Sequence, residues 1–422
     1  MLDPTETPRR QPLGDGLVLR TAADERDVER VAAFNSAIHG PEVGPMIHNL
    51  FIHHPHTRGQ DMVFVEDEQG NQIVSSLCLI PWMWRYEDVE IPAGEMGAVG
   101  TLEAYQHRGL VRAQVEYFKR RLRERGCLLS HIQGIPYYYR QFGYEYALPL
   151  EGGLRLETRH IPTPPDAPFT FRLATQDDLP TLMRLYDEAA QHLVIHTVRD
   201  ETIWRYLLTR TDETDTGCEN WLIQDADGQI VGYVRLPEHH FGEELVVSEV
   251  SRLGFEAALA TLQRLKTLVG ERDKPGIRLN LPADCTLMRL ARSLDAHDLT
   301  TYAWQIHVPD VAALLRALAP VLERRVAGSP FAGLTRDVRL SLYRETIVLR
   351  FVAGRLTEIA TLGFTGGEES RFPPLQFIPL LMGYRTVKEL RGVYPDVSVA
   401  PAWRLLVDTL FPKVESFIYT IY

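Results

Sequence analysis

The chain has 422 residues, of which 45% are apolar and 24% charged, and its formal net charge is −11 at pH 7. This length exceeds the roughly 250 to 300 residues at which a single core stops growing, so we expect two or three domains. The excess of acidic residues argues against a nucleic-acid-binding protein, which would present a basic face, and favours cationic small molecules or basic peptides as ligands.

No apolar run approaches the roughly 20 residues that a membrane-spanning helix needs, and residues 1–16 are polar and contain prolines. We therefore expect a cytoplasmic protein that does not enter a membrane. The four cysteines lack Cys-x-x-Cys spacing, and the histidine-rich residues 48–56 are interrupted by Pro55 and contain neither a cysteine nor a pair of carboxylates. Neither a disulfide framework nor a metal site is expected.

The spacing of apolar residues predicts the elements of the first third of the chain. In chain order we expect a flexible tail over residues 1–16, a strand at 17–20, a helix at 23–38, strands at 62–66, 72–81, 82–91 and 96–102, and a helix at 110–125. Gly126 stands where a left-handed cap would end the last helix. We therefore expect the first third of the chain to fold as one unit that contains both strands and helices.

A strand, a turn rich in hydrogen-bond donors and a helix follow one another over residues 99–113. The first amides of a helix have no intrahelical acceptors and carry the positive end of its dipole, so they stabilise an anion. Gly109 allows close approach to the backbone, and Arg108 and Arg112 add full charges. The stretch predicts a phosphate-binding helix N-terminus. The alternative is an ordinary surface helix with a basic first turn.

The pattern of the first unit recurs after a proline-rich link at residues 161–168. A strand and helix over 169–191 and a hairpin over 221–236 repeat the opening elements, which indicates an internal duplication. From about residue 307 a third unit follows, with a helix at 311–325 and a small antiparallel sheet at 336–361. The chain ends in aromatic and apolar residues at 411–422, and because free ends are normally polar, we expect this end to be docked inside the protein.

Two motifs in the first unit resemble those of the GNAT N-acetyltransferase superfamily. Residues 106–111, Gln-His-Arg-Gly-Leu-Val, resemble its Gln/Arg-x-x-Gly-x-Gly/Ala motif, and residues 139–144, Tyr-Arg-Gln-Phe-Gly-Tyr, are similar to its Tyr-x-x-x-Gly-aromatic element. They occur in the right order, separated by one helix and one strand. The resemblance implies an acetyl-CoA site whose residues are Val99, Gly100, Thr101, Arg108, Gly109, Leu110, Val111 and Arg112.

The whole chain resembles the Eis (enhanced intracellular survival) family within that superfamily. This implies an α+β protein with tandem GNAT folds, mixed central sheets flanked by helices, and a C-terminal domain like a sterol carrier protein. The active GNAT domain would span residues 17–150, a degenerate copy 151–305, and the third domain 306–422 with its end in the active site. The copy lacks the Gln/Arg-x-x-Gly motif and carries Glu249 near the anion position, which predicts that it no longer binds the cofactor.

The resemblance implies that Tyr139 is the general acid and that the carboxylate of Tyr422 is the base. Tyr137 and Tyr138 remain alternatives for the residue that faces the thioester, and the Tyr422 carboxylate could instead anchor the ammonium substrate, because a carboxyl group of pKa about 3.5 is a weak base. A phenol of pKa about 10 is a reasonable donor to a thiolate of about 8.5.

We therefore expect an acetyl-CoA-dependent N-acetyltransferase acting on primary amines of a cationic acceptor, such as an aminoglycoside, a polyamine or a lysine-containing peptide. The alternative is a protein that binds a lipid or another apolar ligand through its C-terminal domain. The resemblance also implies a homo-oligomer, with a hexamer as the expected assembly. No metal and no nucleic-acid partner are expected.

Overall fold

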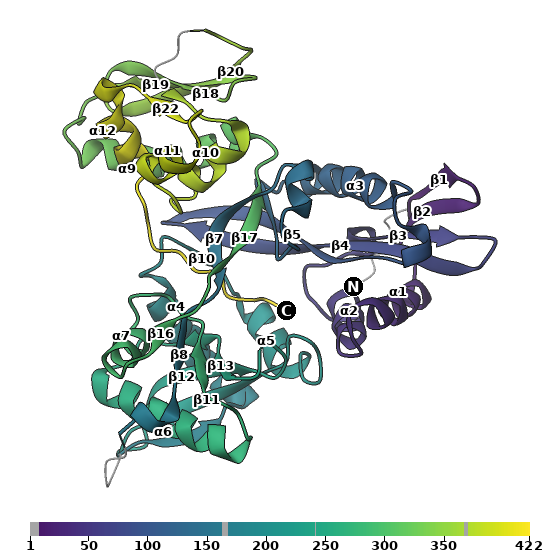
Figure 1. The fold of residues 1–422 in the computed structure, drawn as a ribbon, viewed down its shortest axis with the longest axis vertical. Helices are drawn as coiled ribbons and strands as arrows, with labels where there is room; N and C mark the ends of the chain where they lie inside the picture. Colours follow the sequence, from purple (N-terminus) through teal and green to yellow (C-terminus); the bar gives the residue numbers. More distant parts are fainter. Residues whose placement is uncertain (1–7, 163–167, 241, 367–369) are drawn as a thin grey trace.

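The computed structural model describes residues 8–162, 168–240, 242–366 and 370–422. Figure 1 shows three units: a long twisted sheet with helices on both faces, a second unit at the bottom of the view and a third at the top. The prediction of an α+β fold is confirmed, since mixed sheets alternate with helices along the whole chain. Most of the proline-rich link at 161–168 lies outside the described residues.

The first sheet has its strands in the order β1-β2-β3-β4-β5-β6-β17-β7, and β10 pairs with one end of β4. Helices α1 and α2 cover one face and α3 covers the other (Figure 1). The strands are β1 (Arg10–Gly14), β2 (Leu17–Thr21), β3 (Met62–Asp67), β4 (Gln72–Tyr86), β5 (Val89–Thr101), β6 (Leu129–Ile132), β7 (Glu145–Glu151), β10 (Ile195–Thr197) and β17 (Tyr302–His307), and the helices are α1 (Glu25–His39), α2 (Val43–Ile52) and α3 (Leu110–Glu124).

Two parts of this sheet differ from the expectation. Arg10–Gly14, which the sequence places in a flexible tail, is strand β1 and pairs antiparallel with β2. The strand expected at 72–81 continues through Pro81 to Tyr86 as the single strand β4, and residues 89–91 of the strand expected at 82–91 instead begin β5. Along one edge of β4, the pairing with β3 ends at Cys78 and the pairing with β10 begins at Trp84. Proline is tolerated between them because no described strand on that edge accepts a hydrogen bond from the backbone at Pro81.

The helix that follows the donor-rich turn has the predicted bounds and end. Leu110–Glu124 is helical, and Gly126 has φ +67°. The amide of Cys127 donates to the carbonyl of Leu122 at 2.9 Å, which closes a Schellman turn. The amphipathic pattern buries Val115, Phe118 and Leu122 against the sheet, so the helix start is held in a fixed place beside the strands.

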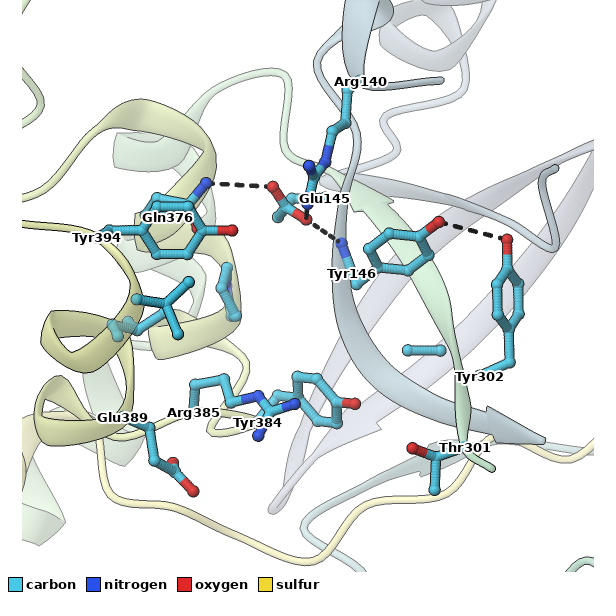
Figure 2. Close-up of a pocket in the computed structure, with 14 residues that line it drawn as sticks. Arg140, Glu145, Tyr146, Thr301, Tyr302, Gln376, Tyr384, Arg385, Glu389 and Tyr394 are labelled. Carbon is cyan, nitrogen blue, oxygen red and sulfur yellow. Dashed lines mark hydrogen bonds and ion pairs between the residues drawn. The ribbon is translucent and has the colours of Figure 1, made fainter. Parts of the chain in front are cut away.

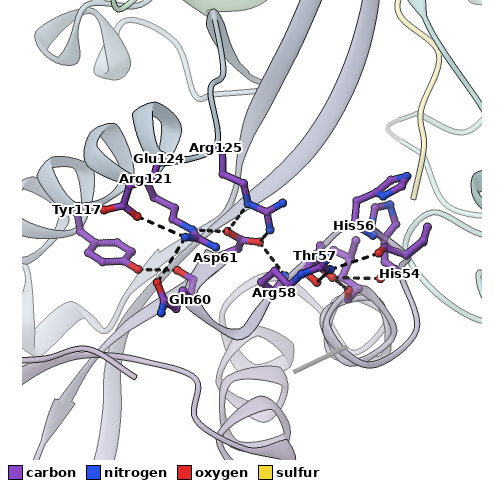
Figure 3. A network of polar contacts seen from close by, with 12 residues as sticks. His54, His56, Thr57, Arg58, Gln60, Asp61, Tyr117, Arg121, Glu124 and Arg125 are labelled. Atoms are coloured by element: carbon purple, nitrogen blue, oxygen red, sulfur yellow. Dashed lines mark hydrogen bonds and ion pairs between the residues drawn. The ribbon is translucent and has the colours of Figure 1, made fainter. Parts of the chain in front are cut away.

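A buried carboxylate holds the other end of this helix (Figure 3). Asp61, only 1% exposed, lies in the 3-10 turn Gly59–Asp61 that precedes β3. Its Oδ1 accepts from Arg121 Nε at 2.8 Å and from Arg125 Nε at 3.1 Å, and its Oδ2 accepts from the amide of Arg58 at 2.7 Å. Because both arginines come from α3, the aspartate ties the helix to the strand connection.

We expect Asp61→Ala to destabilise the fold by about 3–5 kcal/mol, because it leaves two guanidinium groups facing an interior without their carboxylate. Urea denaturation followed by circular dichroism measures this. Glu124→Ala is the matched control: Glu124 contacts the same Arg121 at 3.4 Å, but its side chain is 48% exposed, so a change of less than about 1 kcal/mol is expected. Equal losses in the two variants would contradict the role given to Asp61.

The second unit repeats the strand order of the first. Its strands run β9-β11-β12-β14 and β13-β15-β8-β16, with β13 and β14 consecutive along the chain. The strands are β8 (Leu154–Leu156), β9 (Thr170–Leu173), β11 (Cys218–Gln224), β12 (Ile230–Pro237), β13 (Leu245–Val247), β14 (Glu249–Val250), β15 (Ile277–Leu279) and β16 (His297–Asp298), and the helices are α4 (Leu179–Ala190), α5 (Glu201–Thr209), α6 (Phe255–Glu271) and α7 (Thr286–Ser293).

The third unit is a five-stranded sheet covered by short helices. The helix expected at 311–325 is two helices that meet at Leu318, because Pro320 in the first turn of the second helix breaks the run. The strands are β18 (Arg336–Ser341), β19 (Thr346–Val352), β20 (Arg355–Leu362), β21 (Ser370–Arg371) and β22 (Ser398–Val399), and the helices are α8 (Val311–Ala317), α9 (Ala319–Ala327), α10 (Pro374–Leu381), α11 (Val387–Val393) and α12 (Pro401–Leu410).

The units share strands as well as packing. Strand β17, which the sequence divides between the second and third domains, lies in the first sheet between β6 and β7. Strand β10, which follows α4 of the second unit, also joins that sheet. Within the described part of the chain, every helix is too short or too polar to cross a membrane.

Candidate active site

The centre of the first sheet contains a point where two parallel strands separate. β5 and β6 pair over three residues, the last pair being Glu95 with His131. β5 then bends at Ala98, whose φ is +49°, and its pairing with β4 shifts register between Ser76 and Cys78. We call the place where the strands part, after Glu95 and His131, the first fork. Beyond it, an extended ligand could hydrogen-bond to the backbone of β5.

The predicted cofactor residues of β5 lie on the arm beyond the first fork. Gly100 and Thr101 pair with Ser76 and Ser75 of β4, and Val99 lies between them and the bend. The absence of a side chain at Gly100 has a packing reason, since a Cβ there would lie 3.0 Å from Cγ2 of Ile38 on α1. The arm is thus held from its far side by β4 and α1.

The start of α3 leaves its first amides uncapped. Gly109 is the N-cap residue with φ +76°, makes no side-chain cap, and has no atom within 4 Å of where a Cβ would be. Arg108 Nη2 lies 3.4 Å from Asp15 Oδ2 and its guanidinium stacks on Tyr105. Arg112 stacks over the ring of Phe142. Leu110, in contrast, is buried at 4% exposure and serves the core, and Val111 is half-buried.

Of the three consecutive tyrosines, only Tyr139 turns inward. Tyr137 is 74% exposed, Tyr138 is half-buried and Tyr139 is 5% exposed, in the 3-10 turn Tyr138–Phe142. Gly134 makes room for it, since a Cβ there would lie 2.3 Å from the Tyr139 ring. Burial raises the pKa of the Tyr139 phenol above its usual value, with smaller contributions from two neighbouring tyrosines. The phenol therefore stays protonated over the ordinary pH range.

The opposite face of the fork holds a buried acid and a histidine that the sequence did not single out. Glu95 and His131 are 3% and 0% exposed, and Glu95 Oε2 lies 3.6 Å from His131 Nε2. The rings of Trp82, Trp84 and Trp304 surround the imidazole at centroid distances of 4.8, 4.6 and 5.0 Å. Burial lowers the pKa of His131, with Glu95 acting against it, so the imidazole is neutral.

Several polar atoms of this cluster have no hydrogen-bond partner among the described residues, although Glu95 Oε2 and His131 Nε2 face each other at 3.6 Å. They are Glu95 Oε2, both ring nitrogens of His131 and the indole nitrogens of Trp82, Trp84 and Trp304. Buried polar groups are almost always hydrogen-bonded, so six such atoms in one place make this cluster a candidate site for proton exchange or for a polar ligand. The sequence signal was a glutamate within the apolar run of residues 91–96, but only the strand register brings it beside His131.

The end of the chain reaches the same cluster. The phenol of Tyr422 donates to Glu95 Oε1 at 2.9 Å, and its ring packs edge-on against Trp82 at 6.1 Å. The terminal backbone oxygen accepts from Thr420 Oγ1 at 2.9 Å. Tyr139 belongs to the apolar core under α3, whereas Tyr422 packs against the core on the other face. The two predicted catalytic tyrosines thus approach the fork from opposite faces of the sheet.

A cavity of about 420 Å³ borders the turn that carries Tyr139 (Figure 2). One wall comes from the first unit, where Arg140 Nη2 donates to Glu145 Oε1 at 2.7 Å. The other comes from the third unit, whose Gln376 donates to Glu145 Oε2 at 3.2 Å. Tyr146 and Tyr302 close one side, with 3.4 Å between their hydroxyl oxygens. The third unit therefore supports the turn that carries Tyr139 through Glu145.

In the described part of the chain, no three histidine, cysteine or acidic side chains converge as metal ligands would. Residues 20–147 match the family model of the acetyltransferase (GNAT) domain. No curated protein matches the chain.

Solved structures share the fold of the whole chain. A GCN5-related N-acetyltransferase from Anabaena variabilis ATCC 29413 has 15% identity and a TM-score of 0.68 over 95% of this chain and 99% of its own. One from Kribbella flavida has 16% identity and a TM-score of 0.62 over 95% and 97%. Eis1 from Mycobacterium abscessus has 15% identity and a TM-score of 0.62 over 96% and 100%.

Proposed function

We propose that the protein transfers an acetyl group from acetyl-CoA to a primary amine of a cationic acceptor. Residues 20–147 match the GNAT acetyltransferase family model, and the whole chain shares its fold with a GCN5-related N-acetyltransferase. The observation that supports this proposal is the first fork, which has an open strand arm and, on one face of the sheet, a buried carboxylate; the uncapped start of α3 and the buried phenol of Tyr139 belong to the same unit, on the other face. Those four parts correspond to the needs of acyl transfer from a thioester.

The helix start and the strand arm fit the two ends of acetyl-CoA. The uncapped amides after Gly109, flanked by Arg108 and Arg112, suit the pyrophosphate. The backbone of Val99, Gly100 and Thr101 suits the amides of the pantetheine arm, which would bring the thioester to the fork. The uncovered surface at Gly109, with its left-handed φ, is consistent with a bulky group approaching the backbone there.

The transfer requires two proton movements. The amine nitrogen attacks the thioester carbonyl, the C–S bond breaks and an amide forms, while the amine loses one proton and the thiolate gains one. Tyr139 is the donor to the thiolate, because its buried phenol keeps its proton. The terminal carboxylate of Tyr422 takes the proton of the amine, and Glu95 holds the Tyr422 ring in place through the phenol.

The acceptor side of the fork is acidic and aromatic. Glu95, the terminal carboxylate and the rings of Trp82 and Trp304 would all favour a cation, since a desolvated ammonium is stabilised both by carboxylates and by aromatic faces. The net charge of −11 also attracts cations to the protein, and it does so at longer range than these contacts. An acetyl-CoA consumption screen over aminoglycosides, polyamines and lysine peptides identifies which cationic amine is used.

Calorimetry with CoA tests cofactor binding directly. We expect micromolar-range binding by the native protein and a loss of at least about 10-fold in affinity, or about 1.4 kcal/mol, for Arg108→Glu, because the change puts a negative charge beside the helix start. Arg123→Glu on the exposed far end of the same helix is the matched control and should bind as the native protein does. Absence of binding to the native protein would overturn the proposed function.

The alternative of a lipid-binding protein is not favoured. Phe372, Phe377 and Phe411 contact one another inside the third unit and fill its centre. The cavity at its border has Leu390 and Val393 in its wall, but also the charged Arg140, Glu145 and Arg385, which a hydrocarbon chain would desolvate. Native mass spectrometry decides between the two, since co-purified CoA supports the enzyme and co-purified lipid the alternative.

The homo-oligomer implied by the family resemblance stays a proposal, with a hexamer as the expected assembly. An isologous or cyclic assembly of this chain would appear in light scattering coupled to size-exclusion chromatography as a mass that is a multiple of 48.1 kDa. A mass of one chain at all concentrations would contradict it.

A further inference from the structure

The second unit contains a fork like that of the first. β13 and β15 run parallel over three pairs, ending with Val247 and Leu279. The chain then continues as β14, which leaves β15 and pairs with β12 instead, through Glu249 and Val250. As with β5 and β6, a parallel pairing of three residues is followed by separation of the two strands. We call the place after Val247 and Leu279 the second fork.

The C-terminal segment of the chain, residues 415–420, lies at this second fork. Glu415 Oε1 accepts from the amide of Asp284, which lies on the chain beyond β15. The carbonyl of Thr420 accepts from Arg199, which is bonded to Glu249 on β14. A cavity of about 350 Å³ is lined by both arms of the fork, with Val250 and Pro282 among them, and by Tyr419 of the segment. The segment is therefore bonded to both arms.

Arg199 is the centre of this attachment. It is 4% exposed, and its guanidinium donates to Glu249 Oε1 at 2.8 Å and Oε2 at 2.7 Å. The same guanidinium donates to the carbonyl of Thr420 from Nε at 3.0 Å and Nη2 at 2.6 Å. Tyr186 and Trp204 contact its faces at 4.5 and 4.7 Å. Such a desolvated, bidentate pair fixes the position of whatever it binds, here a carbonyl two residues before the chain end.

Backbone bonds continue the attachment toward the first sheet. The amide of Phe417 donates to the carbonyl of Ile195 at 3.0 Å, and Thr197 Oγ1 donates to the carbonyl of Tyr419 at 2.7 Å. Ile195 and Thr197 belong to β10, whose other edge pairs with β4 of the first sheet. One strand thus connects the position of the C-terminal segment to the sheet that carries Glu95.

We propose that the second unit holds the C-terminal segment at the place where the first unit would hold its cofactor, and that Arg199 is a positioning residue that sets where Tyr422 meets Glu95. Glu249, whose charge would by itself only disfavour a bound phosphate, orients Arg199. The catalytic consequence rests on the proposed function, but the attachment itself does not.

Two variants test the attachment without removing Tyr422. Arg199→Met removes both hydrogen bonds from the guanidinium to the carbonyl of Thr420, and Glu249 still faces Arg235, its cross-strand neighbour on β12. Arg199→Lys keeps the positive charge beside Glu249 but cannot make two parallel hydrogen bonds as the guanidinium does. We therefore expect this variant to fold even if the methionine variant is too unstable to purify. Arg264→Met, a partly exposed arginine of α6 that stacks on Trp221, is the matched control.

The first readout is release of tyrosine from the chain end by carboxypeptidase. We expect the native protein and Arg264→Met to resist, because Tyr422 is docked, and both Arg199 variants to release it at least about 10-fold faster. This measurement needs no substrate, so it remains decisive even if CoA does not bind. Release from folded Arg199 variants at the native rate would overturn the proposal.

The second readout is turnover. A displacement of about 1 Å in a reacting group can cost about 10²-fold in rate, so we expect kcat to fall about 10²-fold in Arg199→Met and less in Arg199→Lys, with the KM for acetyl-CoA unchanged. A purely structural effect would lower the amount of folded enzyme and leave kcat per folded molecule at the native value, which would overturn the positioning role. Absence of any CoA binding or turnover in the native protein would instead count against the proposed function.

Discussion

Replacing Tyr139 by phenylalanine is expected to lower kcat by about 10²- to 10⁴-fold, the range that a positioned general acid contributes. Phenylalanine keeps the ring that packs over Gly134, so the fold and the KM for acetyl-CoA should stay at native values. The loss should be confined to the chemical step, because only the proton donor to the departing thiolate is removed. Steady-state kinetics with the acceptor found in the screen measures it.

The pH profile gives an independent check on Tyr139. Burial raises the pKa of its phenol, so the acid form persists above the usual phenol value of about 10. Native kcat should therefore show no decline with rising pH that is due to this group. A decline at high pH that disappears in Tyr139→Phe would contradict the raised pKa of the phenol and leave Tyr139 as the acid.

Tyr138→Phe is the matched control for the same turn. Tyr138 packs edge-on against Tyr139 and Phe142 but is half-buried, and we expect its variant to retain more than about a third of native kcat. A large loss in Tyr138→Phe together with native turnover in Tyr139→Phe would show that Tyr138, and not Tyr139, is the general acid. That outcome would leave the proposed reaction intact and correct only the donor.

Much of the first unit could be predicted because its signals are local. The amphipathic pattern of α3 and the glycine after it fix both the buried face and the end of the helix, and the structure has both. The turn with Gly109 predicts an uncapped helix start, and Gly109 indeed has a positive φ and a free surface. Periodicity and caps act within a few residues, so the sequence alone is enough to locate them.

The parts that could not be predicted depend on pairing between distant strands. Glu95 and His131 lie 36 positions apart, and only the register of β5 on β6 makes them neighbours. Strand β17 enters the first sheet from beyond the second unit, so the expected boundary near residue 305 divides a strand of that sheet. No local pattern carries such register, because each strand shows only which of its faces is apolar.

Pro81 and Glu249 show how a correct local rule led to a wrong or incomplete interpretation. A proline normally interrupts a strand, but Pro81 lies where one edge of β4 is paired with no described strand. A glutamate repels phosphate, which fits a unit that has lost its cofactor, but Glu249 is 2% exposed and bonded to Arg199. In both cases the neighbours across the sheet decide what the residue does.

Removal of Tyr422 is expected to lower kcat by at least about 10²-fold while CoA affinity stays within about twofold of the native value, because the chain end lies on the face of the sheet opposite α3. The shortened chain would end at Ile421, which leaves its carboxylate one residue away from the fork. Turnover and CoA calorimetry on the same preparation measure the two effects separately. Undiminished turnover would show that the terminal carboxylate has no part in the reaction.

Tyr422→Phe separates the carboxylate from the phenol. It keeps the terminal carboxylate and the ring against Trp82, and it loses only the hydrogen bond to Glu95 Oε1. Burial and Glu95 both raise the pKa of this phenol, so in the native protein it is a neutral donor that orients the chain end. We expect kcat to fall by no more than about 10-fold, because the terminal carboxylate, the group proposed to take the proton, is retained. A loss as large as that of the truncation would place the proton transfer on the phenol and Glu95 instead of the terminal carboxylate.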